Sequence, residues 1–127
     1  MKLRIQGNSV RFRLTRSEVD QLHREGSVSD ATVFPGGSTL EYSLETSSMT
    51  GQPRAAFTAD RVVVQIPAPV ARKWAVTDEV SISAVQPLED EGGLSILVEK
   101  DFACLTPREG EDESDQFPHP LKGQETC

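Results

Sequence analysis

The sequence predicts a β-rich α+β fold in which two similar tandem halves close one small barrel around a pseudo-twofold axis. Several short runs alternate apolar and polar residues, as expected of strands with one buried face. Two further segments carry the start signals of short helices, a capping box at Thr15 and prolines around Ala68. The elements follow the same order twice: strand, strand, short helix, strand, strand.

The first half covers about residues 1–46. Gly7-Asn8 supplies the tight turn of a first hairpin. Thr15 and Glu18 have capping-box spacing and are expected to start a short helix. Gly26 suits the position just after the end of that helix. Val19, Leu22 and His23 are expected on one face of that helix. The expected strands of this half are 1–6, 10–14, 28–34 and 39–46.

The second half covers about residues 55–105 and repeats this plan. Pro69 suits the first position of its short helix, where Val70 and Trp74 are expected on the inner face. An acidic turn, 87–93, joins the last two strands. The expected strands of this half are 55–59, 61–66, 79–86 and 94–105.

The two halves align as an internal repeat in pattern rather than in identity. At an offset of 52 residues, Val10, Phe12 and Leu14 fall on Val62, Val64 and Ile66. At an offset of 54, Leu40, Tyr42 and Leu44 fall on Leu94, Ile96 and Val98. Each half alone leaves sheet edges unpaired, so both are expected in one domain, 1–106. Residues 107–127 are expected to be an acidic, largely irregular C-terminal tail.

Composition narrows the function classes. The net charge of −7 disfavours a general nucleic-acid binder, although it does not exclude one. Two cysteines do not make a disulfide framework, so a reducing, cytoplasmic location is expected. No apolar stretch is long enough for a membrane span or a signal peptide, so neither membrane insertion nor export is expected. No cofactor is predicted.

A basic ribbon is the most informative surface feature. Four cationic residues fall on the outward face of the first predicted hairpin, namely Lys2, Arg4, Arg11 and Arg13. One interpretation is a contact surface for a protein partner or for nucleic acid. The other is that long charged side chains cover the sheet and protect its edge from aggregation.

No catalytic or metal signature appears. A nucleophilic pair of Cys104 with His119 lacks a third residue to orient the base. The same two residues match no closed zinc pattern, and the run 109–115 lacks the ligand ladder of a calcium loop. Phe117 is a candidate for docking back onto the domain or onto a partner.

Part of the second half resembles the AbrB/SpoVT swapped-hairpin module. The resemblance is carried by Asp60-Arg61-Val62-Val63-Val64-Gln65-Ile66-Pro67, then Val70, Arg72, Trp74, Val76, Val80 and Ile82. It departs from that module at the short Thr77-Asp78 turn and at Leu14-Thr15, where the family has Ile-Pro. In that family two short chains form one barrel, so the resemblance implies a barrel whose two halves lie in one chain, and arginines on the barrel face that contact DNA.

The whole chain also resembles a family of small bacterial proteins of unknown function. Met1-Lys2-Leu3-Arg4-Ile5 and Arg13-Leu14-Thr15-Arg16-Ser17-Glu18-Val19 carry that likeness, which implies no activity. Three functional hypotheses follow, in order of preference. The first is a non-catalytic binding or interaction module, acting as a monomer or weak homodimer. The second is a DNA-binding regulator that uses the basic ribbon. The third is an enzyme that uses Cys104.

Overall fold

A computed structural model of the chain describes residues 1–102, 115 and 117. Within them lie eight strands and two helices. The first half contributes β1 (Lys2–Ile5), β2 (Ser9–Leu14), α1 (Arg16–Glu25), β3 (Ser27–Val33) and β4 (Thr39–Ser47). The second half contributes β5 (Arg54–Thr58), β6 (Arg61–Pro67), α2 (Ala68–Val76), β7 (Ser81–Pro87) and β8 (Gly93–Lys100).

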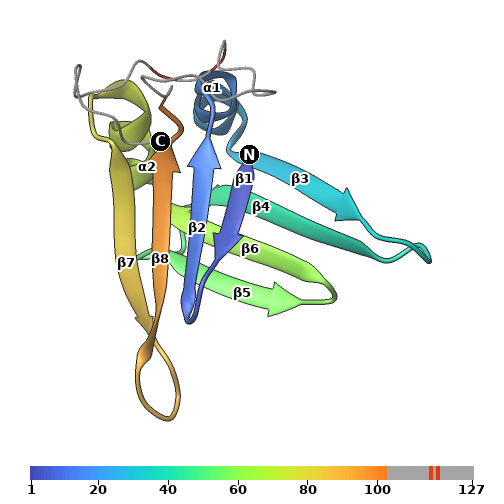
Figure 1. The fold of residues 1–127 in the computed structure, drawn as a ribbon. Helices are drawn as coiled ribbons and strands as arrows, with labels where there is room; N and C mark the ends of the chain where they lie inside the picture. The colour runs from blue at the N-terminus through green and yellow to red at the C-terminus, as the bar shows by residue number, and fades with distance from the viewer. Residues whose placement is uncertain (103–114, 116, 118–127) are drawn as a thin grey trace, which may run out of the picture.

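The strands form two four-stranded sheets, a first sheet ordered β1-β2-β8-β7 and a second ordered β3-β4-β6-β5. In each sheet two antiparallel hairpins meet through a central parallel pair, β2 with β8 and β4 with β6. Each sheet therefore takes one hairpin from each half. Figure 1 shows the second sheet crossing the first, with both helices at one end. The β-rich α+β class is confirmed, whereas no closed barrel is found among the described strands and that part of the prediction is unconfirmed.

The two parallel pairings have matching registers. In the first sheet Val10 lies beside Ile96 and Phe12 beside Val98. In the second sheet Val62 lies beside Tyr42 and Val64 beside Leu44. These partners are related by the offsets of 52 and 54 residues, so corresponding apolar residues of the two halves meet in corresponding ways.

The helix signals are confirmed at both starts. Thr15 and Glu18 form the capping box of α1, and Gly26 ends that helix in the left-handed conformation, with φ of 86°. A proline stands near the start of α2 as expected. The prediction for Val70 was wrong: its side chain is 40% exposed, and Ala71 and Trp74 are the buried residues of α2. His23 is likewise exposed, unlike Val19 and Leu22.

One apolar core lies between the inner faces of the sheets and the two helices. Trp74 is fully buried there, and its indole Nε1 donates a hydrogen bond to the Val80 carbonyl at 3.1 Å. The buried apolar side chains are Phe12, Leu14, Val19, Leu22, Val28, Leu44, Val62, Val64, Ile66, Ala71, Trp74, Ile82, Ile96 and Val98. Both halves therefore share a single core.

The last strand is shorter than its sequence pattern. β8 ends at Lys100, whereas the pattern predicted a strand as far as Leu105. Residues 103–105 lie outside the described residues, as do Cys104, His119 and, apart from Asp115 and Phe117, the expected tail 107–127. No helix in the described part of the chain is both long and apolar enough to cross a membrane.

Candidate functional site: the basic face of the first sheet

The basic ribbon lies on the outer face of the first sheet. Lys2 stands opposite Arg13, and Arg4 opposite Arg11, in the antiparallel β1–β2 pair. All four side chains point away from the core because their neighbours Leu3 and Phe12 point into it. We call Lys2, Arg4, Arg11 and Arg13 the basic face. Like charges directly opposite each other repel, so such a pairing needs counterions or a partner.

Glu99 provides one of those counterions. It follows Val98 in β8 and faces outward beside Arg13 in the parallel register. Its Oε1 accepts a hydrogen bond from Arg11 Nε at 2.6 Å and one from Arg13 Nε at 2.8 Å. The carboxylate side chain is only 14% exposed, so these charge-assisted bonds are partly shielded from water.

Asp101 provides a second counterion at the end of β8. Its Oδ2 lies 3.2 Å from Lys2 Nζ, and its residue is buried. Its backbone N–H donates to the Leu14 carbonyl at 2.8 Å, which fixes the chain as it leaves the sheet. Among the described residues, four cations thus meet two carboxylates, and Arg4 forms no ion pair with any of those residues.

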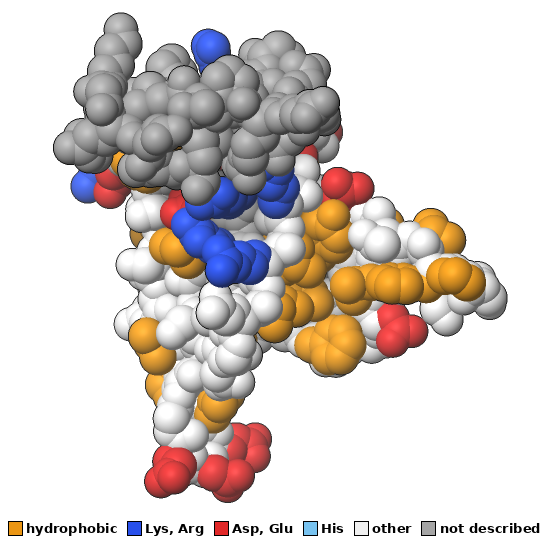
Figure 2. Space-filling model, in the orientation of Figure 1, with side chains coloured by type: hydrophobic (Ala, Val, Ile, Leu, Met, Phe, Trp, Pro, Cys, Tyr) orange, Lys and Arg blue, Asp and Glu red, His pale blue; other side chains and the backbone are white. Residues whose placement is uncertain are grey.

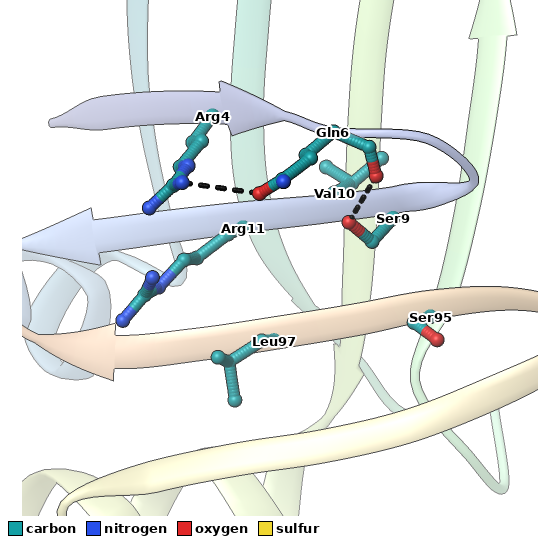
Figure 3. Close-up of a pocket in the computed structure, with 7 residues that line it drawn as sticks. All are labelled: Arg4, Gln6, Ser9, Val10, Arg11, Ser95 and Leu97. Atoms are coloured by element: carbon teal, nitrogen blue, oxygen red, sulfur yellow. Dashed lines mark hydrogen bonds between the residues drawn. The ribbon is translucent and has the colours of Figure 1, made fainter.

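A first pocket lies beside Arg4 and Arg11. Its volume is about 210 Å³, and it is lined by Arg4, Gln6, Ser9, Val10, Arg11, Ser95 and Leu97. Figure 3 shows both guanidinium groups extending toward the carboxyl end of β2, with the Leu97 side chain nearby. Arg4 donates to Gln6 Oε1 at 3.0 Å, which leaves further N–H groups available.

A second pocket shares Arg4 and Arg11 with the first and extends across the basic face, and we call the two pockets together the groove. The volume of the second pocket is about 330 Å³, and Lys2, Leu3, Arg4, Arg11 and Arg13 line it. Figure 2 shows a band of Lys and Arg side chains near the centre of this side of the molecule. A concave, cationic surface with fixed donors is suited to carboxylate or phosphate groups.

The second sheet has no equivalent basic face. The counterpart of Glu99 is Glu45, which accepts a hydrogen bond from Gln65 Nε2 at 2.9 Å. Gln65 corresponds to Arg13 at the offset of 52, and Val63 corresponds to Arg11. The carboxylate is thus present in both sheets, whereas the paired arginines occur in the first sheet alone.

Lys100, the last residue of β8, is a buried lysine. It is 7% exposed, and its Nζ donates to the Thr77 carbonyl at 2.7 Å. The ammonium lies 5.8 Å from the Trp74 ring centroid and 5.5 Å from that of Phe117. Burial lowers the pKa of Lys100, although the carboxylates of Asp78 and Glu79 oppose that shift.

Lys100→Met is expected to change how stability depends on pH. The folded pKa of Lys100 lies below its ordinary value of 10.5, so between these values the unfolded chain binds more protons. The wild-type free energy of unfolding therefore gains a rising contribution toward pH 10.5, which the variant lacks. Urea denaturation at pH 7 to 10 measures the difference. Parallel curves for the two proteins would contradict the expected change.

Asp115 and Phe117 show where the chain returns to the fold. The Asp115 carbonyl accepts from Arg16 N at 2.9 Å, and its carboxylate accepts from the backbone and hydroxyl of Ser17. Hydrogen bonding from Ser17 lowers the pKa of Asp115. Phe117 is half-buried, with its ring 5.7 Å from that of Phe102. The candidate docking of Phe117 therefore takes place on the domain itself.

Sequence reasoning found the cations and missed their surroundings. Glu99 and Asp101 were not recognised as counterions, and Gln6, Ser9, Ser95 and Leu97 were not recognised as lining. The alternating pattern placed Glu99 on an outward face, but only the parallel pairing of β2 with β8 shows which cations it meets. Among the described residues, no group of three or more His, Cys, Asp or Glu side chains could hold a metal ion.

Comparison with known proteins identifies a family but no characterised relative. No curated protein and no solved structure matches the chain. The family model described as "Family of unknown function (DUF7009)" matches residues 1–121, nearly the whole chain. This protein, with its paired sheets and one basic face, therefore belongs to the DUF7009 family.

Proposed function

We propose that the protein is a non-catalytic binding module whose basic face recognises an anionic segment of a protein partner. The single observation that carries this proposal is the excess of cations over carboxylates, among the described residues, around a groove on the first sheet. Arg11 and Arg13 are held in place by Glu99, so little side-chain entropy remains to be lost on binding. Arg4 adds a cation without an ion-pair partner in the described part of the chain.

The surroundings of the groove favour binding over catalysis. Its described lining combines arginines with Gln6, Ser9, Ser95 and Leu97, and these residues include neither a cysteine nor a histidine as nucleophile or base. The Ser9 hydroxyl donates a hydrogen bond to the backbone carbonyl of Gln6 at 2.6 Å, and not to a general base. A surface of this kind can hold carboxylates through charge-assisted hydrogen bonds.

A labelled octaglutamate peptide tests the proposal by fluorescence anisotropy at low ionic strength. The wild type is expected to bind it, and Arg4→Ala with Arg11→Ala is expected to weaken binding about tenfold, equivalent to roughly 1.4 kcal/mol. Arg24→Ala and Arg61→Ala are matched controls, because both residues are exposed cations away from the basic face. Equal losses in the control and test variants would refute a specific site.

Glu99→Gln is expected to move stability and binding in opposite directions. The free energy of unfolding falls by about 1–2 kcal/mol, because charge-assisted hydrogen bonds to Arg11 and Arg13 become neutral ones. Binding of octaglutamate rises several-fold, because a competing negative charge has left the basic face. Urea denaturation and anisotropy measure the two effects. A parallel fall in both would show that Glu99 acts only through folding.

A DNA-binding regulator of the swapped-hairpin type is the second candidate. The exchange of hairpins between halves, and the matching registers of the two parallel pairs, support a duplicated module of that kind. The barrel, the single domain at 1–106 and the cytoplasmic location belong to the same proposal. Salt-dependent retention on duplex DNA, lost on Arg11→Ala with Arg13→Ala, would favour it. No retention at low salt would eliminate it.

A further inference from the structure

The first sheet also carries an acidic turn at the end opposite the basic face. Leu88 N donates to the Gly92 carbonyl at 3.3 Å and closes the turn between β7 and β8. Its tip consists of Glu89, Asp90 and Glu91, all exposed. None of these three carboxylates forms an ion pair with a described residue. Figure 2 shows them as a separate cluster at the tip of the hairpin.

The geometry of this turn does not require its charge. The corresponding turn in the first half closes in the same way, from Phe34 N to the Ser38 carbonyl at 2.7 Å. The residues at its tip are Pro35, Gly36 and Gly37. One half therefore builds a turn of this kind without charge, and the other places three carboxylates there. The first sheet alone carries both the basic face and the acidic turn.

The acidic turn cannot neutralise the basic face of its own molecule. Arg11, with Arg4 opposite it, lies beside Leu97, which is four residues after Gly93, where β8 begins. At about 3.3 Å per residue this is roughly 13 Å, still well beyond the reach of a salt bridge. The complementary charges can meet only between molecules.

We propose that the acidic turn docks on the basic face of a second copy of this chain. This inference rests on the proposed function, because it names the anionic segment that the basic face recognises. The turn joins β7 and β8 at one side of the sheet, whereas the basic face lies on β1 and β2 at the other side and the other end. A two-fold axis between the outer faces of two first sheets, oblique to their strands, therefore places each turn over the other basic face. Both contacts form together, as an isologous dimer requires.

The middle of the outer face permits such an approach. Ser9, Ser83 and Ser95 carry short side chains there, beside Leu97 and the 63% exposed Val85. Four strands about 4.8 Å apart and six residues long give a footprint of roughly 400 Å² for each copy. The total of about 800 Å² is below the roughly 1,200 Å² of stable specific interfaces, so the dimer is weak and transient and forms only at high protein concentration.

The test is a charge swap measured by sedimentation velocity at 0.1 M salt. Arg4→Glu and the pair Glu89→Lys with Glu91→Lys each place like charges at both contacts of a homodimer. Each protein alone is expected to dimerise at least about tenfold more weakly than the wild type. An equimolar mixture restores association, because both contacts of the heterodimer are again between opposite charges. All three positions are exposed, so the fold should persist, as circular dichroism can check.

Arg61→Glu is the matched control, since Arg61 is an exposed cation on the second sheet. It should dimerise as the wild type does. Wild-type protein that stays monomeric at about 0.5 mM overturns the inference, as does a dimer that neither variant weakens or that the mixture fails to restore. If the monomeric wild type still binds octaglutamate through Arg4 and Arg11, the proposed function survives and only the second copy is ruled out.

Discussion

Trp74→Ala is expected to lower the free energy of unfolding by roughly 3–5 kcal/mol, because a fully buried aromatic side chain is removed from the shared core. The helix that carries Trp74, α2, contacts α1 and β4 of the first half and β6 and β7 of the second half, so the cavity cannot collapse by moving one helix alone. A typical domain is stable by only about 5–15 kcal/mol, so this loss is a large part of the total.

The lost hydrogen bond contributes little to that effect. The Val80 carbonyl that accepts from the indole also accepts from Lys100 N at 3.0 Å, so it keeps a partner in the variant. The loss therefore comes mainly from the cavity and the transfer of the ring to water. Lys100 also loses an aromatic neighbour, at 5.8 Å from the ring centroid.

Urea denaturation followed by far-UV circular dichroism measures the change, because Trp74 is the only tryptophan and its fluorescence disappears with it. Val76→Ala is the matched control, since Val76 lies on the same helix with 63% of its surface exposed. It should alter stability by less than about 0.5 kcal/mol. A Trp74→Ala loss below about 1 kcal/mol would contradict a core centred on this helix.

Local patterns predicted the elements because each depends on neighbouring residues. The alternation of Val10, Phe12 and Leu14 gives the buried face of β2 without knowledge of its partner. Thr15 with Glu18 places the start of α1 through two hydrogen bonds over three residues. The same reasoning misplaced Val70. Ala71 and Val70 lie three and four residues before Trp74, so both are near its face of the helix, and it is the small Ala71 that packs against the core.

The candidate site was only half predictable because its contacts are not local. The cations were visible from the sequence, since β1 and β2 are joined by a short turn. Glu99 lies 88 residues after Arg11, and only the parallel pairing of β2 with β8 brings them together. No alternation within β8 indicates its neighbour. The counterions, and hence the remaining charge of the basic face, therefore emerge only from the tertiary arrangement.

The acidic turn illustrates the same limit. Its charges were visible as a run in the sequence, and the turn itself was predicted. Its position on the sheet that carries the basic face depends on the exchange of hairpins between halves. Had each half folded its two hairpins into its own sheet, the acidic turn and the basic face would lie on different sheets. Hairpin exchange thus gives one surface both complementary charges.

Residues 1–52 and residues 53–106, each expressed alone, are expected to be largely unfolded. Each half contributes one hairpin to each sheet, and an isolated two-stranded hairpin is at best marginally stable in water. Each half would also leave two strand edges unpaired, because their parallel partners lie in the other half. These strands are β2 and β4 in the first half, and β6 and β8 in the second. Chains of about 50 residues bury too little apolar surface to offset these losses.

Circular dichroism, cooperative urea unfolding and sedimentation of each half measure the outcome. Mixing the two halves is expected to restore β structure and a cooperative transition, because the parallel pairs and the shared core can then form between chains. A stable, folded monomer of either half would be incompatible with hairpin exchange as the basis of the fold. It would also remove the link between the basic face and the acidic turn, since both lie on the first sheet only when the halves are combined.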